Sequence, residues 1–182
     1  FATGFCEAVV AQTPYQSQEI DIRLNGTSNI HDWEMKAVKG SSEASFTIDL
    51  KNKVTALTSL SFILPATNLK SEHKVMDNNT YKALKTAKNP NLSFVLASAT
   101  VVLTGTDTYQ LNFSGKLTIA GTTKETNLIA TAKYNPADKS LTITGVKKMK
   151  MTDYNVKPPK ALIGTIKQGD NISISYTKKY TR

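Results

Sequence analysis

The segment YQLNFSGKLTIA, residues 109–120, places hydrophobic side chains at nearly every second position and polar side chains between them. This period of two is typical of a β-strand with one apolar face and one face in water. The same alternation recurs at residues 20–24, 46–50, 60–64, 92–96, 128–134, 141–143 and 172–176. The sequence therefore predicts one large antiparallel sheet, whose apolar face must contact something.

Short polar turns separate the alternating runs. They lie at residues 51–53, 105–107, 120–122 and 135–139 and are rich in Gly, Asn, Asp, Lys and Pro. Hairpins that follow one another directly form a meander. Two runs, 92–103 and 109–120, are long for strands. Long strands, successive hairpins and little helix favour a closed up-and-down barrel over the alternative, a two-sheet sandwich.

Two segments interrupt the alternation. Residues 76–88 are predicted to form a short helix, with Asp77 or Asn78 as its N-cap, and Asn89-Pro90 ends it. Residues 151–162 contain Pro158-Pro159 and so cannot form a central strand.

The composition of the chain limits the classes of partner that we expect it to bind. A chain of 182 residues suits a single domain, and no stretch approaches the ~20 consecutive apolar residues of a membrane span. The net charge is +9, but the lysines are scattered and the only arginines are Arg23 and Arg182. Nucleic-acid readers tend to use arginine and clustered basic patches, so no nucleic-acid partner is predicted. The charge fits solubility or transient contact with a membrane surface.

Residues 1–14 are predicted to be a separate N-terminal segment that precedes a barrel domain over residues 15–182. Val9-Val10-Ala11 before Gln12 resembles a signal-peptidase site, which predicts a periplasmic or otherwise exported protein. The segment could instead be a true mature N-terminus or bind a partner. Cys6 is the only cysteine, which excludes an intramolecular disulfide or a multi-cysteine metal site.

The sequence contains few residues in arrangements typical of catalytic sites. His31 and His73 are far apart and lack nearby cysteines or paired carboxylates, so no metal site is predicted. The phosphate-binding loop and the nucleophile elbow are both absent. We therefore predict no catalytic residue, no cofactor and no enzyme activity. An enzyme that acts on a lipid bound in the same scaffold is the alternative.

Two stretches, residues 141–151 and 29–35, carry side chains that could contact a ligand. Strict alternation along residues 141–151 would point Lys147 inward, toward the polar end of a ligand. A β-bulge at Gly145 that resets the alternation is the favoured interpretation. Trp33 and Met35 should share one face with His31, and large adaptable side chains of this kind suit either a core or a lipid pocket.

Four blocks of the sequence resemble the YceI-like family: GTSNIHDW (26–33), MDNNTYKALK (76–85), GKLTIAGTT (115–123) and MTDYNVKPP (151–159). They occur in the family's order, and the similarity runs from about Tyr15 to the C-terminus. The resemblance implies an all-β fold: a single extended eight-stranded antiparallel lipocalin-like barrel with one short helix near its opening. It also implies that long isoprenoid or other amphiphilic chains bind inside, and that the protein is exported to the bacterial periplasm.

We therefore expect non-enzymatic binding, transport or storage of a long-chain amphiphile: a polyisoprenoid, an isoprenoid quinone, or a fatty acid or amide. Each buried CH₂ contributes about 0.8 kcal/mol, so a deep apolar tube would remove such a chain from water and leave its head at the mouth. The candidate ligand-binding residues are Trp33, Met35, Phe46, Ile48, Leu60, Phe62, Met76, Tyr81, Leu84, Phe94, Leu96, Phe113, Leu117, Leu128, Ile143, Met149, Met151 and Ile174. Candidate head-group contacts are His31 and Lys147, with Trp33 and Tyr81 at the same mouth. The alternative is a structural or interaction subunit of a bacterial envelope assembly, as a homodimer or with an envelope-protein partner.

Overall fold

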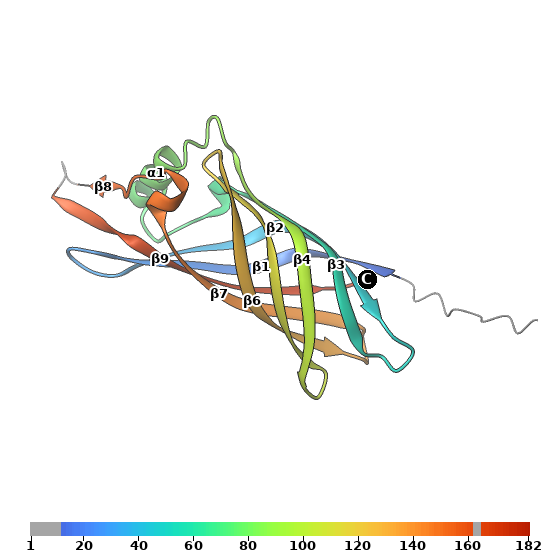
Figure 1. The fold of residues 1–182 in the computed structure, drawn as a ribbon. Helices are drawn as coiled ribbons and strands as arrows, with labels where there is room; N and C mark the ends of the chain where they lie inside the picture. The colour runs from blue at the N-terminus through green and yellow to red at the C-terminus, as the bar shows by residue number, and fades with distance from the viewer. Residues whose placement is uncertain (1–11, 162–164) are drawn as a thin grey trace, which may run out of the picture.

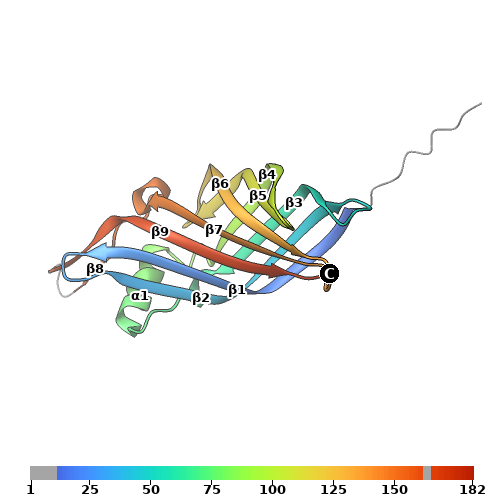
Figure 2. The same cartoon turned by 90° about the horizontal axis from the view of Figure 1, so that it is seen from below.

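The computed structural model of the protein describes residues 12–161 and 165–182. Within them, eight long strands form most of the structure (Figures 1 and 2). These strands are β1 (Gln12–Ser28), β2 (Trp33–Ile48), β3 (Val54–Pro65), β4 (Asn91–Gly105), β5 (Thr108–Ile119), β6 (Thr122–Asn135), β7 (Ser140–Lys150) and β9 (Ile166–Tyr180). The short elements are η1 (Ala66–Asn68), α1 (Lys74–Ala83), η2 (Met151–Tyr154) and β8 (Lys160–Ala161).

The strands pair antiparallel in chain order, and β9 then pairs with β1 to close the sheet into a barrel. At this closure Ile20 lies opposite Lys178 and Gly26 opposite Ile172. The predicted up-and-down barrel is therefore confirmed, and the sandwich is excluded. β8 pairs only with the start of β9, at the edge of the sheet, as Pro158-Pro159 requires. Gln12, Thr13 and Pro14, assigned from the sequence to the N-terminal segment, belong to β1.

The predicted turns join the strands as expected. One of the tightest joins β5 to β6: Ile119 pairs with Thr122, and only Ala120 and Gly121 lie between them. Both have positive φ angles, 51° and 80°. This is the backbone of a two-residue hairpin whose twist matches that of the strands it connects.

Strand pairing is incomplete at two places. β3 and β4 pair only through Ser61–Pro65 and Asn91–Val95, and Figure 1 shows the two strands separating beyond that point. β6 and β7 pair only through Ala130–Asn135 and Ser140–Gly145. The barrel wall therefore has two gaps, and β4, β5 and β6 lean away from the rest of the sheet.

The interior side chains form two clusters, which we call the aromatic end and the helix end. The aromatic end is built around Tyr15, Phe46, Tyr109, Tyr134 and Tyr180, all of them almost fully buried. The helix end is built around Trp33, Met35, Leu84, Met151 and Tyr154. The ring of Phe46 lies edge-on to the rings of Tyr15 and Tyr180, with centroids 5.5 and 6.2 Å apart, so the Phe46 ring packs directly against both.

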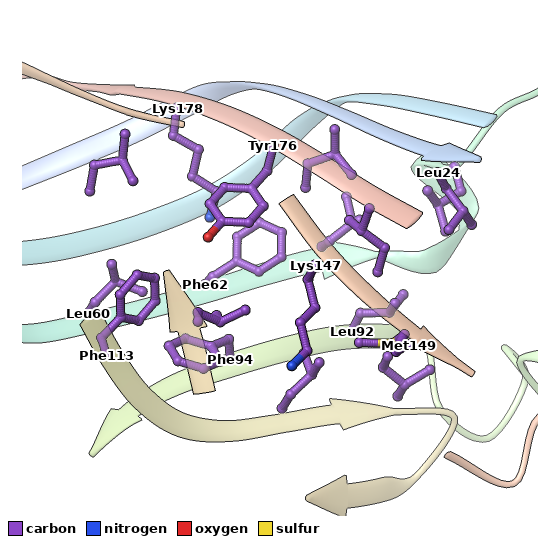
Figure 3. A pocket seen from close by; sticks show the side chains of 18 of the residues that line it. Leu24, Leu60, Phe62, Leu92, Phe94, Phe113, Lys147, Met149, Tyr176 and Lys178 are labelled. Atoms are coloured by element: carbon purple, nitrogen blue, oxygen red, sulfur yellow. The ribbon is translucent and has the colours of Figure 1, made fainter. Parts of the chain in front are cut away.

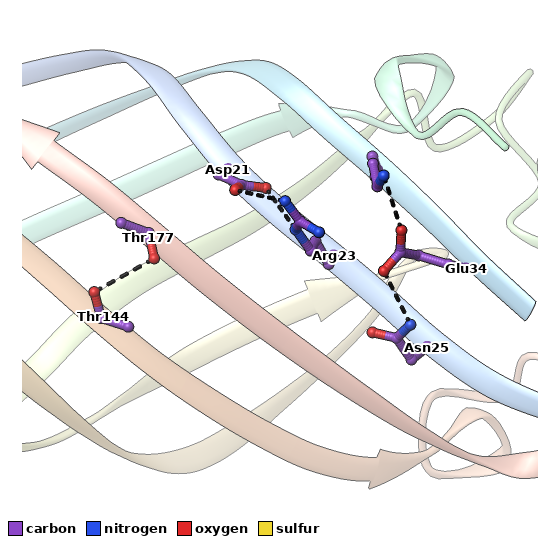
Figure 4. Close-up of polar contacts among 7 residues, drawn as sticks. Asp21, Arg23, Asn25, Glu34, Thr144 and Thr177 are labelled. Carbon is purple, nitrogen blue, oxygen red and sulfur yellow. Dashed lines mark hydrogen bonds and ion pairs between the residues drawn. The ribbon is translucent and has the colours of Figure 1, made fainter.

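The outer face of the barrel carries the polar half of the alternation. On β1 and β2, Asp21 pairs with Arg23, and Glu34 accepts a hydrogen bond from Asn25 (Figure 4). These side chains are exposed, and such pairs contribute little to stability. Their role is to keep this face of the sheet in water.

The helix begins and ends earlier than the sequence predicts: it spans Lys74–Ala83 instead of residues 76–88. α1 starts at Lys74, after His73 as N-cap, so the prediction of Asp77 or Asn78 as N-cap is wrong. The Asp77 carboxylate instead accepts hydrogen bonds from the backbone N–H and the hydroxyl of Ser71, at 2.7 and 2.8 Å. Asp77 is buried by this contact, which ties the helix to the segment before it.

Candidate functional site

An apolar cavity of about 140 Å³ lies between the aromatic end and the helix end. Side chains from seven of the eight long strands in the described chain line it; β2 is the exception. We call this space the inner cavity. It is lined by Ile22, Leu24, Leu60, Phe62, Leu64, Leu69, Leu92, Phe94, Phe113, Leu117, Ile119, Leu128, Ile143, Lys147, Met149, Ile174, Tyr176, Lys178 and Tyr180.

A second cavity of about 70 Å³, the helix cavity, extends from the first toward α1. Its remaining walls come from the helix end and from η2, including Trp33, Met35, Leu84 and Met151. Six residues line both cavities: Leu24, Leu69, Leu92, Ile119, Met149 and Ile174. The two spaces therefore adjoin, and together they follow the barrel interior from the helix to the aromatic end.

Glycines allow aromatic rings to lie flat against the cavity wall. Gly145 is paired with Tyr176 across β7 and β9, and a Cβ at Gly145 would lie 2.3 Å from the Tyr176 hydroxyl oxygen. At Gly115 a Cβ would lie 2.5 Å from the Phe94 ring. No side chain larger than hydrogen fits beneath these rings, so the glycines fix where the rings lie.

The helix end is held by specific contacts. The Tyr81 hydroxyl donates to the Leu69 carbonyl at 2.7 Å, which fastens α1 to the segment before it. Leu84, just after the helix, is buried. The Trp33 indole N–H donates to the Thr27 carbonyl at 3.0 Å, so its ring keeps a fixed position beside the helix cavity. Figure 1 shows α1 over this end of the barrel.

The sequence model of the YceI-like domain matches residues 17–179. The chain belongs to the YceI-like family. The match covers nearly the whole barrel, from β1 to β9. No curated protein matches the chain in sequence.

Several solved structures share this fold at low sequence identity. BcnA from Burkholderia cenocepacia is 18% identical, with a TM-score of 0.67 over 88% of this chain and 95% of its own. A polyisoprenoid-binding domain from Saccharophagus degradans, implicated in plant cell wall breakdown, is 9% identical, with a TM-score of 0.69 over 94% and 99%. The YceI protein of Campylobacter jejuni is 17% identical, with a TM-score of 0.55 over 76% and 79%.

The YceI-like barrel brings most of the sequence-predicted site residues to the two cavities. Those on the inner cavity are Leu60, Phe62, Phe94, Phe113, Leu117, Leu128, Ile143, Lys147, Met149 and Ile174. Those on the helix cavity are Trp33, Met35, Leu84 and Met151, together with Met149 and Ile174.

Other candidates lie elsewhere. Phe46, Ile48 and Leu96 pack at the aromatic end and line neither cavity. Met76 and Tyr81, on α1, also line neither. His31 is exposed in the turn between β1 and β2, where its Nδ1 lies 2.8 Å from the Asp32 carbonyl oxygen, so the structure does not place it at the cavities.

The favoured interpretation of Lys147 is wrong. Pairing between β7 and β9 runs without a shift in register from Leu141 to Lys150, so Gly145 forms no bulge and the alternation continues. Lys147 lines the inner cavity, and its Nζ donates to the Asn127 carbonyl at 3.1 Å. Asn127 lies on β6 beyond its pairing with β7, so Lys147 bridges one gap in the wall.

Three polar residues of β9 that line the inner cavity were missed. Lys178 is 8% exposed, and its Nζ lies 3.4 Å from the centroid of the Phe62 ring. Burial lowers the pKa of Lys178 to about 7 and raises the pKa values of Tyr176 and Tyr180 to about 12. All three have the same parity as Ile172 and Ile174, so the alternation itself could have found them.

Hydrogen bonding differs between the two tyrosines. The Tyr180 hydroxyl shares a hydrogen bond of 2.7 Å with the Ser42 hydroxyl. The buried Tyr176 hydroxyl has no hydrogen-bond partner among the described residues. Figure 3 shows Tyr176 and Lys178 extending from β9 into the same cavity.

In the part of the chain that the structure describes, no group of three or more His, Cys, Asp or Glu side chains could hold a metal ion. None of the helices in this part combines the length and the apolar character needed to cross a membrane. The predicted signal-peptidase site and Cys6 lie outside the described residues, except for Gln12.

Proposed function

We propose that the protein binds a long-chain amphiphile inside its barrel and carries or stores it. The observation that supports this most directly is the pair of adjoining apolar cavities between the helix end and the aromatic end. The proposed ligand class is a polyisoprenoid or isoprenoid quinone, or a fatty acid or amide. The likeness to a polyisoprenoid-binding domain in fold supports the same class.

The lining has the chemistry such a ligand needs. Most of the side chains on the inner cavity are aliphatic or Phe, and each CH₂ transferred to them from water contributes about 0.8 kcal/mol. Among the described lining residues, polar side-chain atoms come only from Lys147 on β7 and from Tyr176, Lys178 and Tyr180 on β9. Such a surface binds a long apolar chain strongly, and its few polar groups select the head group.

The cavity must widen to hold a long chain. At about 140 Å³ the inner cavity resembles in size an engineered cavity of ~150 Å³ that holds benzene. Leu24, Leu92 and Met149 lie between the two cavities and are only half-buried, so they have room to move. Methionine is also unbranched and adaptable. We expect these side chains to swing aside when a chain enters.

Binding is tested on two neighbouring residues of β6. Leu128 lines the inner cavity, whereas Ile129 is 64% exposed on the outer face. The protein is extracted with organic solvent, the extract is analysed by mass spectrometry, and the emptied protein is titrated with a polyisoprenol and a fluorescent fatty-acid probe. Leu128→Trp should weaken binding by about tenfold or more, because overpacking such a site costs about 1–3 kcal/mol. Ile129→Trp should bind like the wild type.

Binding of neither ligand by the emptied wild-type protein would refute the proposal. So would equal affinity of the two tryptophan variants, because the lipid would then not occupy the inner cavity.

The wider role is part of the same proposal. We assign the protein no catalytic step, and we place it in the periplasm or outside the cell, in agreement with the signal-peptidase site predicted at residues 9–12. Fractionation of cells that express the full-length precursor, with N-terminal sequencing of the product, tests the location. Recovery of the uncleaved precursor from the cytoplasm alone would contradict it. Subunit function in an envelope assembly, as a homodimer or with another protein, is the alternative if no lipid binds.

A further inference from the structure

The inner cavity contains a buried lysine, Lys178, without a counter-ion among the described residues. Lys178 is 8% exposed, and no described carboxylate lies within ion-pair distance of its Nζ. Its nearest recorded partner is the face of Phe62, 3.4 Å from Nζ to ring centroid. A ring face attracts an ammonium group but replaces only part of its hydration. An unpaired ammonium is expensive to bury, so an anion beside Nζ would stabilise the charged form of Lys178.

The other described residues that line the cavity include no carboxylate. β1, β3, β4, β5 and β6 contribute only apolar side chains to the lining, and β7 adds one titratable group, Lys147. Lys147 is itself a cation and already donates to the Asn127 carbonyl. The remaining titratable groups, Tyr176 and Tyr180, are on β9, and burial raises both pKa values to about 12, so both stay neutral.

A second polar group beside Lys178 also lacks a partner. The Tyr176 hydroxyl, two residues along the same face of β9, is buried and has no hydrogen-bond acceptor among the described residues. A buried donor without an acceptor costs about 1–3 kcal/mol. Two side chains of one strand thus present an ammonium group and a hydroxyl to the same apolar cavity (Figure 3).

We propose that Lys178 and Tyr176 anchor the carboxylate of a long-chain acid, which enters the barrel head first and leaves its tail toward α1. This inference rests on the proposed lipid-binding function. It reverses the orientation expected from the sequence, in which the head remains at the mouth. A carboxylate has two oxygens and one negative charge, which match one ammonium and one hydroxyl. A phosphate would keep further oxygens unpaired in an apolar space.

The test compares three ligands of equal chain length: palmitic acid, its methyl ester and the corresponding primary alcohol. Each displaces a fluorescent lipid probe from the emptied protein. Wild-type protein should prefer the acid by about ten- to a hundredfold, the value of a hydrogen bond to a charged group. Lys178→Met should abolish that preference, so that acid and ester bind the variant equally. Lys133→Met, the same change on the outer face of β6, should retain the preference.

A second measurement does not depend on any variant. The charge of Lys178 is followed by NMR of its side-chain amine, and the acid should raise its pKa because a nearby anion stabilises the ammonium form. The ester should leave the pKa unchanged.

Three results would overturn the inference while leaving lipid binding intact: equal affinity of the wild type for acid and ester, loss of the preference in Lys147→Met but not in Lys178→Met, or binding of a polyisoprenol but not of the acid. Failure of every lipid would instead refute the proposed function.

Discussion

Lys178 should make the stability of the protein depend strongly on pH. Its pKa is about 7 in the folded protein and 10.5 when unperturbed, so between these values the unfolded chain binds a proton that the folded protein does not. The free energy of unfolding therefore rises with pH across this window. This gain in the free energy of unfolding is complete above about pH 10.5, and it is lost as the pH falls through 7.

The size of the effect follows from the shift in pKa. One pKa unit corresponds to about 1.4 kcal/mol, so this residue alone should raise the free energy of unfolding by about 2–3 kcal/mol from pH 7 to pH 9. Tyr176 and Tyr180 act in the opposite direction, because their folded pKa values of about 12 exceed the unperturbed 10.0. Their effect begins only near pH 10, so it does not disturb the lower window.

The assay is urea denaturation of the emptied wild type and of Lys178→Met at several pH values between 7 and 9. Methionine has a similar length and no charge, so we expect the variant to be the more stable protein at pH 7. The difference should shrink by about 1.4 kcal/mol for each pH unit. All other titrating groups are common to both proteins and cancel in the difference. A difference that stays constant across this range would refute the argument, because the ammonium group would then remain solvated in the folded protein.

Three further substitutions test the packing. Gly145→Ala should destabilise the protein by about 1–3 kcal/mol in urea denaturation, because the new Cβ would displace the Tyr176 ring. Phe46→Ala should lower stability by about 3–5 kcal/mol yet leave the affinity for the lipid probe unchanged, since Phe46 lies at the aromatic end and lines neither cavity. Asp77→Ala should lower stability by about 1–3 kcal/mol in thermal denaturation, because it removes the acceptor of both Ser71 hydrogen bonds.

Each of these has a matched control. Gly105→Ala should be neutral, because a Cβ there would meet nothing closer than 3.8 Å. Phe113→Ala should also destabilise the barrel but should change lipid binding, since Phe113 lines the inner cavity. Asn78→Ala, at an exposed position of α1, should have little effect. If the variants at Phe46 and Phe113 affected binding equally, the separation between packed end and cavity would be wrong.

The fold was predictable because the alternation of apolar and polar residues recurs in strand after strand. Alternation set which side of every strand faces inward, and the turns at residues 51–53, 105–107, 120–122 and 135–139 set the order of the hairpins. Local rules were less dependable. The start of α1 was misplaced because Asp77 has a competing partner in Ser71, which only the folded chain brings within reach.

The site was predictable only in part. Phe46 and Phe62 have the same residue type and the same inward orientation, yet the first is packed and the second lines a cavity. The difference depends on the distance between opposite walls of the barrel, and the sequence of one strand does not determine that distance. Lys178 and Lys147 are residues for which the alternation alone gives the correct orientation. It predicts that both side chains point inward, but an inward lysine is easily attributed to a local irregularity such as a β-bulge.

The pairing of β1 with β9 has a consequence for how the protein is made. Ile20 and Lys178 meet only after the chain between them has been synthesised and folded, and contacts this distant in sequence form slowly. Until then β1 and β7 both present unpaired edges, and the inner cavity lacks the strand that carries Tyr176 and Lys178. Under the proposed function, a chain that lacks β9 should therefore not retain a lipid. Tyr176 and Lys178, the proposed anchor of the head group, lie on the last of the eight long strands to be synthesised, so ligand binding would require that strand to have joined the barrel.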